Sequence, residues 1–115
     1  MENSRQIKFR AWNKETNVMY LDSFNMINPY EIIIGFGDIK DFIWMQYTGL
    51  KDKNGKEIYE GDILKDFSNR ISNVHWDEYD AKFETYELER LTSSNALEYE
   101  IIGNLYENPQ LLGEE

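Results

Sequence analysis

The chain has 115 residues, 41% hydrophobic and 15% aromatic, so it can bury a core without metal or disulfide support. It contains no cysteine, which excludes disulfides, thiolate zinc sites and a cysteine nucleophile. Residues 1–76 hold 11 acidic and 10 basic side chains, whereas residues 77–115 hold 11 acidic and 2 basic, giving a net charge of -10. This acidity disfavours nucleic acid as a ligand and favours a protein partner.

The segments that would direct a chain into or across a membrane are not visible in the sequence. The first ten residues lack an apolar signal region, and the apolar run at 32–36 is far shorter than the ~20 residues of a membrane span. No repeat or linker divides the chain. We therefore expect a single domain over residues 1–115 that acts in the cytoplasm and does not contact a membrane.

The first predicted element is an N-terminal β-hairpin. Apolar and charged side chains alternate over residues 7–12, as in a strand with one buried face. A polar loop at 13–17 and a partner strand at 18–21 complete the hairpin. Residues 22–30 have no regular pattern, and the β-branched residues at 31–36 predict a further strand.

The middle of the chain is marked by turns. Residues 38–47 approximate helical spacing, but they also suit a short turn followed by a strand that ends at Thr48-Gly49, which we favour. Asn54-Gly55 is typical of a tight hairpin turn, because both residue types readily adopt positive φ angles. A second turn is predicted at residues 60–62.

The rest of the chain predicts more short strands. They cover residues 63–67, 72–76, 81–86 and 99–105, with a polar loop at 68–70. Residues 87–97 fit either a strand end with a loop or a single helical turn, and Asn108-Pro109 predicts a capped short helix. The fold class is therefore all-β with minor helix, and we expect an SH3-like barrel with an additional N-terminal β-hairpin subdomain.

Two groups of polar side chains could carry chemistry. His75, followed by acidic residues, could act as a general base or a metal ligand, but the sequence offers no nucleophile or second ligand beside it. Asp77, Glu78 and Asp80 could bind a hard cation, but they lack the EF-hand pattern and fit an acidic turn. We predict no catalytic residues, no metal site and no cofactor.

Two charged sets are candidate interaction sites. A tentative protein-binding acidic face comprises Glu87, Glu89, Glu98 and Glu100, of which the last two are expected on one face of the final strand. In a sharper version this face imitates the phosphates of DNA and occupies a basic groove of another protein. The simpler interpretation is that these carboxylates form a solvated surface that maintains solubility.

The alternative is a loop that binds nucleic acid. It comprises Lys51, Lys53 and Lys56, with Arg5, Lys8 and Arg10 nearby. The net charge of -10 weighs against this alternative.

Three segments resemble a known family. Residues 45–63 (MQYTGLKDKNGKEIYEGDI) are similar to the characteristic segment of the YopX family of bacteriophage and prophage proteins, and residues 7–12 and 102–109 resemble its typical beginning and end. The resemblance implies a phage or prophage origin, action in the bacterial cytoplasm and a mainly β fold with an SH3-like barrel. It implies no catalytic residues. We therefore expect a non-enzymatic protein–protein interaction module with a host or phage partner and a capacity to form homo-oligomers. In the alternative, the chain is a nucleic-acid-associated protein that supports phage replication or transcription.

Overall fold

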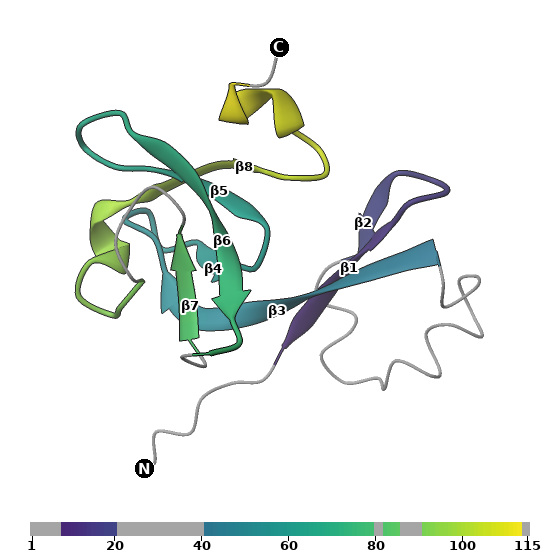
Figure 1. Ribbon diagram of the computed structural model, residues 1–115, viewed down its shortest axis with the longest axis horizontal. Helices are drawn as coiled ribbons and strands as arrows, with labels where there is room; N and C mark the ends of the chain where they lie inside the picture. Colours follow the sequence, from purple (N-terminus) through teal and green to yellow (C-terminus); the bar gives the residue numbers. More distant parts are fainter. Residues whose placement is uncertain (1–7, 21–40, 80–81, 86–90, 114–115) are drawn as a thin grey trace. The chain divides into compact units, whose positions relative to one another are not determined.

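A computed structural model describes residues 8–20, 41–79, 82–85 and 91–113 (Figure 1). Within these ranges the protein is mainly β, with two antiparallel sheets and short 3-10 helices, which confirms the predicted all-β class. The chain divides into two compact units, Met1–Tyr47 and Thr48–Glu115. The single-domain interpretation stays a prediction, because two compact units can belong to one domain or to two.

The elements follow one another in the order strands, a 3-10 helix, a last strand and a second 3-10 helix. They are β1 (Phe9–Asn13), β2 (Val18–Tyr20), β3 (Phe42–Lys51), β4 (Glu57–Tyr59), β5 (Asp62–Lys65), β6 (Ile71–Asp77), β7 (Lys82–Thr85), η3 (Ala96–Glu98), β8 (Glu100–Asn104) and η4 (Pro109–Leu112). The sheets have the strand orders β2-β1-β3-β4 and β7-β6-β5-β8, and the second is curled (Figure 1).

The predicted N-terminal hairpin is present in the first unit. β1 pairs with β2 antiparallel, and Asn13 closes the loop by accepting hydrogen bonds at Oδ1 from the N–H groups of Glu15 and Thr16, at 2.8 and 3.1 Å. Asn17 follows with a φ of 60°, which asparagine tolerates better than most residues. The predicted irregular stretch at 22–30 and strand at 31–36 lie outside the described residues.

A small aromatic cluster covers the strand pair β1 and β3. Ala11 and Phe42 are buried, and the ring of Phe42 lies 5.9 Å from that of Tyr20 and 6.1 Å from that of Trp44. These separations are typical of favourable tilted ring pairs. The cluster explains why the residues after Asp41 form a strand, as we favoured, and not a helix.

The predicted end of this strand at Thr48-Gly49 is wrong, because β3 continues to Lys51. Gly49 has a φ of 88°, a conformation that glycine adopts without strain. The Thr48 hydroxyl donates to the carbonyl of Ile58 at 2.8 Å and accepts from the N–H of Leu50 at 3.1 Å. The side chain thus satisfies backbone groups at the irregularity, and the strand is not broken.

The core of the second unit lies against the sheet β7-β6-β5-β8. Its fully buried centre includes Ile58, Leu64 and Val74, which come from three different strands. The rest of the cluster consists of Phe83, Leu91, Ala96 and Tyr99, with Leu50 and Ile101 packed against it. β6 and β7 place Trp76 directly opposite Phe83, with ring centroids 4.8 Å apart. Buried positions alternate along β6 at Ser72 and Val74 and along β7 at Phe83 and Thr85, as the period-two pattern of strands requires.

The end of the chain corrects one prediction. A short helix does form at η4, but Asn108 does not cap it with its side chain. Instead, Asn108 Oδ1 accepts a hydrogen bond from the N–H of Asn104 at 3.2 Å. The same side chain lies so close to Gly103 that a Cβ there would stand 2.6 Å from Asn108 Oδ1. Glycine at 103 therefore makes room for Asn108 to hold the end of β8.

Candidate interaction surface

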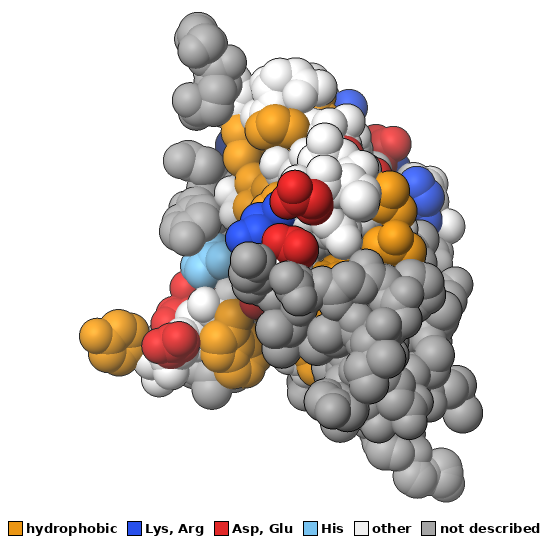
Figure 2. All heavy atoms as spheres, turned by 90° about the vertical axis from the view of Figure 1, so that its right-hand side faces the viewer, with side chains coloured by type: hydrophobic (Ala, Val, Ile, Leu, Met, Phe, Trp, Pro, Cys, Tyr) orange, Lys and Arg blue, Asp and Glu red, His pale blue; other side chains and the backbone are white. Residues whose placement is uncertain are grey.

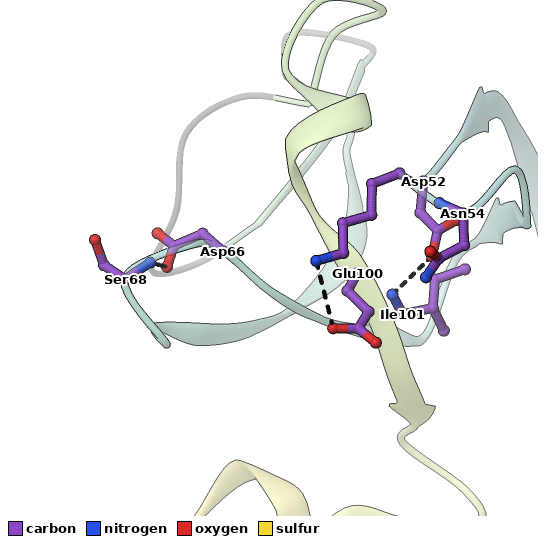
Figure 3. Close-up of polar contacts among 7 residues, drawn as sticks. Asp52, Asn54, Asp66, Ser68, Glu100 and Ile101 are labelled. Carbon is purple, nitrogen blue, oxygen red and sulfur yellow. Dashed lines mark hydrogen bonds and ion pairs between the residues drawn. The ribbon is translucent and has the colours of Figure 1, made fainter.

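The turn between β3 and β4 is organised by a buried carboxylate. Asp52, which is fully buried, accepts hydrogen bonds at Oδ1 from the N–H groups of Asn54 and Lys56, both at 2.9 Å. Its Oδ2 accepts from the N–H of Ile101 in β8 at 3.0 Å (Figure 3). Gly55 has a positive φ of 83°, whereas Asn54 does not. A tight Asn-Gly turn requires positive φ at both residues, so the observed turn is of a different and longer type than predicted.

The turn between β5 and β6 has the same design. Asp66 accepts at Oδ1 from the N–H groups of Ser68 and Arg70, at 2.8 and 2.9 Å, and Asn69 takes the positive φ of 67°. Its Oδ2 accepts from Arg70 Nε at 2.8 Å, within the same turn. Burial raises the pKa of Asp66, but the backbone N–H groups and the guanidinium outweigh burial and hold that pKa below its usual value of 3.8.

This second turn corrects the predicted bounds of a strand. We expected a strand over residues 63–67, but β5 ends at Lys65 and Phe67 lies in the turn, 82% exposed. The cause is the Asp66 side chain, whose hydrogen bonds to later N–H groups favour a turn over a continued strand. Phe67 is the residue of this surface that the sequence prediction missed, since an apolar residue after a strand suggests a core position.

The two turns contribute matching positions to one hollow. Lys53 follows Asp52 in the first turn, and Phe67 follows Asp66 in the second. Together with Glu98 at the end of η3, these two residues form the described wall of an open hollow of about 420 Å³. The surface therefore combines one aromatic ring, one cation and one carboxylate.

Contacts of the lysine side chain join this hollow to β8. Lys53 Nζ lies 3.9 Å from Glu100 Oε1, and the Lys53 N–H donates to the Tyr99 carbonyl at 2.9 Å. Figure 3 shows this ion pair next to the hydrogen bond between Asp52 and Ile101, at the start of β8. The first turn is thus fastened to the start of β8 by side-chain and backbone bonds together.

The described residues include only part of the predicted acidic face, Glu98 and Glu100. Glu87 and Glu89 lie outside the described residues. Glu98 belongs to η3, not to the last strand as expected, while Glu100 begins β8 and pairs with Lys53. The acidic face stays a prediction, and its two described members lie beside a basic residue.

The basic candidates separate into exposed and buried groups. Lys51, Lys53 and Lys56 are exposed, so the lysine loop is open to solvent. Lys8 and Arg10 are buried in the first unit, and Lys8 Nζ lies 5.0 Å from the centre of the Tyr47 ring. These two residues therefore do not extend the lysine loop, whereas Arg5 lies outside the described residues.

His75 takes part in a network of polar and charged side chains across β6 and β7. Its Nε2 lies 3.4 Å from Glu84 Oε2, and Lys82 Nζ lies 3.6 Å from Glu84 Oε1 and 3.9 Å from Asp77 Oδ2. The strand register places His75 opposite Glu84 and Asp77 opposite Lys82. Such cross-strand pairs stabilise a sheet, so the network has an ordinary structural explanation.

Charges of both signs share the visible surface. On the face shown in Figure 2, basic and acidic side chains lie next to one another, and apolar side chains are exposed between them. Among the described residues, no group of three or more histidine, aspartate and glutamate side chains has the arrangement of a metal site. In the same residues no helix is long and apolar enough to cross a membrane.

Comparisons with known proteins confirm the expected family, and the range matched by the family model includes two of the three segments, 45–63 and 102–109. The family model described as YopX protein matches residues 27–113. The crystal structure of protein EF1440 from Enterococcus faecalis is 30% identical, with a TM-score of 0.68, over 95% of this chain and 99% of that chain. Among curated proteins, none matches at a significant level. The chain belongs to the YopX protein family.

Proposed function

We propose that this chain is a phage accessory protein that works by binding another protein and catalyses no reaction. The observation that carries the proposal is Phe67, which is 82% exposed and lies on the wall of the hollow. Aromatic residues are enriched in protein interfaces, where burial of one ring contributes about 1.5–3 kcal/mol. Membership of the YopX family supports the phage association.

The rigidity of the second turn supports this role. Asp66 fixes the turn through three hydrogen bonds, two to backbone N–H groups and one to the Arg70 guanidinium. An aromatic ring on a fixed turn loses little conformational entropy on binding, and such preorganised contacts bind more tightly. The turn therefore favours a role in recognition over a role in the core.

The curled second sheet supports a finer proposal about the fold. We take the second unit to be an SH3-like barrel, a fold that commonly serves as an adaptor for other proteins. Action in the cytoplasm of the bacterial host belongs to the same proposal. The binding surface would then lie on the loops that join the strands of the barrel, where binding residues are commonly found.

We place the acidic residues at the rim of this surface. Lys53 lies 3.9 Å from Glu100, so the start of β8 is not a uniform array of negative charge that imitates DNA. Rim charges act mainly on the association rate and on the choice of partner, whereas buried aromatic residues contribute most of the affinity. Phe67 is therefore the centre of the proposed surface.

Site-specific photocrosslinking tests the proposal. A photoreactive phenylalanine analogue replaces Phe67 in one tagged variant and Tyr79 in a control, since Tyr79 is also aromatic and is 99% exposed. Both variants are expressed in host cells that carry the phage, irradiated, and searched for protein adducts by mass spectrometry. We expect one defined protein adduct from position 67 and none from position 79. Absence of an adduct at 67, or equal adducts at both positions, would overturn the proposal.

A second variant tests the acidic rim. Changing Glu87, Glu89, Glu98 and Glu100 to glutamine removes the charges of the predicted acidic face. We expect the adduct at position 67 to persist with a reduced yield, because the ring and not the carboxylates carries the contact. Complete loss of the adduct would move the centre of the surface to the acidic residues.

A further inference from the structure

We infer that the protein bound at the Phe67 hollow is a second copy of this chain, in a dimer with twofold symmetry. This inference rests on the proposed function, because it names the partner of the same surface. Its starting point is the composition of the hollow, which holds one cation, one carboxylate and one exposed aromatic ring.

A twofold dimer brings the same patch of both copies together, so the patch must be complementary to itself. A patch with charges of one sign fails this requirement, because like charges then meet across the axis. The hollow is complementary to itself in charge, since Lys53 and Glu98 are both on its wall. With the axis between them, Lys53 of each copy faces Glu98 of the other, and two ion pairs form.

The charged groups are available for these pairs. Among the described residues, no hydrogen bond or ion pair is made by the Glu98 carboxylate, which is exposed. The Lys53 side chain is 52% exposed and its ion pair with Glu100 is long, at 3.9 Å. Exposed pairs of this length contribute little, so the ammonium can turn toward a second carboxylate at small cost.

The aromatic ring supplies the apolar centre. Within the described part of the chain, no ring contact or cation–π contact involves Phe67. Leu97, next to Glu98 in the chain, is also 59% exposed. In the dimer each ring is buried at the hollow of the opposite copy, and the charged pairs surround it and exclude water, as in the usual anatomy of an interface.

Sedimentation velocity over a concentration series tests the inference with the full chain. Physiological ionic strength is needed, because screening reduces the repulsion between two chains of net charge -10. We expect the parent to show a reversible monomer–dimer equilibrium. Phe67→Ser should weaken it by about 30-fold, as for an interface hot spot, and the matched control Tyr79→Ser should leave it unchanged.

Charge exchange identifies the pairing itself. Lys53→Glu and Glu98→Lys should each weaken self-association, because each places like charges opposite one another. An equimolar mixture of the two variants should associate again, since glutamate at 53 then meets lysine at 98 and the native pair forms on the other side. The double variant K53E/E98K should also recover self-association. Failure of both the mixture and the double variant to recover would overturn the twofold arrangement.

The photocrosslinking experiment separates this inference from the proposed function. A parent protein that stays monomeric at every concentration, together with an adduct between position 67 and a different protein, overturns the dimer and leaves the binding surface intact. A monomeric parent without any adduct at 67 overturns both. An adduct between two copies of this chain, with the predicted sedimentation, supports both.

Discussion

The turns at residues 52–56 and 66–70 share one backbone design and serve different purposes. Each begins with an aspartate whose Oδ1 accepts two N–H groups of the turn, and each has a residue of positive φ at its fourth position. The difference lies in the second oxygen, which binds Ile101 of β8 in the first turn and Arg70 of the same turn in the second. The first turn therefore holds β8 in place, whereas the second turn is stabilised by bonds within itself and exposes its apolar residue, Phe67.

The choice between aspartate and asparagine follows from the number of oxygens in use. Asn13 and Asn104 also organise turns, and for each of them two N–H groups bind at the same oxygen, Oδ1. An amide suffices for that, because its carbonyl oxygen accepts two bonds. Asp52 and Asp66 use both oxygens, so a carboxylate is required there.

The largest expected effect is at Asp52. Asp52→Ala should lower the free energy of unfolding by about 3 kcal/mol, because three N–H groups lose their acceptor. Asp52→Asn should cost about half as much, since its oxygen still accepts within the turn while its NH₂ group faces the N–H of Ile101. Urea unfolding and hydrogen exchange of the Ile101 amide measure these effects.

The matched control is Asp66→Asn in the other turn, which should leave exchange at Ile101 unchanged. Equal exchange at Ile101 in the parent and in Asp52→Asn would contradict the fastening role of the first turn.

A smaller effect is expected at the fourth position of each turn. Gly55→Ala should cost about 1–2 kcal/mol, because alanine is strained at the φ of 83° although space is free around a Cβ there. Gly55→Asn should cost less, since Asn69 already holds a φ of 67° in the matching turn. Urea unfolding of the two variants makes the comparison, and equal losses for alanine and asparagine would show that the two turns are not equivalent.

The sequence predicts most of the strands that these turns connect, but not the contacts that the turns make. The strands follow period-two patterns whose signal is local, so the hairpin at residues 9–20 and the strands β6 and β7 were predictable. The bond between Asp52 and Ile101 joins residues 49 positions apart, and no local pattern indicates it. The sequence pattern places Phe67 in a strand, because an apolar side chain gives no sign that the preceding aspartate will turn the backbone.

The candidate surface was predicted in fragments. The sequence indicates Lys53 and Glu98 as members of two separate candidate sites, one for nucleic acid and one for a protein. Spacing along the chain could not show that the turn after β3 and the residues before β8 share one hollow. Hydrogen bonds from the Lys53 N–H to the Tyr99 carbonyl and from the Ile101 N–H to Asp52 join these segments. The antiparallel pairing of β8 with β5 brings the turn that holds Phe67 to the same place.

The position after each aspartate should matter little for stability. Phe67→Ser should change the free energy of unfolding by less than about 0.5 kcal/mol, because the ring is exposed and the turn is held by other atoms. Thermal unfolding of this variant and of the parent, both at concentrations low enough for the parent to be monomeric, provides the measurement, because loss of a dimer lowers the apparent stability by itself. A loss above about 1 kcal/mol would show that Phe67 belongs to the core and would contradict its role as the exposed residue of the second turn.

The smallest expected effect is the pH dependence of the stability that Asp66 contributes. The pKa of Asp66 is lowered in the folded chain, so its ionised form stabilises the fold at pH values above the usual 3.8. That contribution is lost as the pH falls through the lower folded pKa. Asp66→Asn should therefore be less stable than the parent near neutral pH, and the difference should shrink in acid. A difference that stays constant down to the acid transition would contradict this account.

The most direct test of the binding surface is a series of ¹H–¹⁵N NMR spectra of the parent protein at increasing concentration. The amides of Lys53, Phe67 and Glu98 should shift together and saturably, while those around Tyr79 on the β6–β7 turn should stay fixed. Shifts confined to the β6–β7 turn, or spectra independent of concentration, would contradict self-association through the Phe67 hollow.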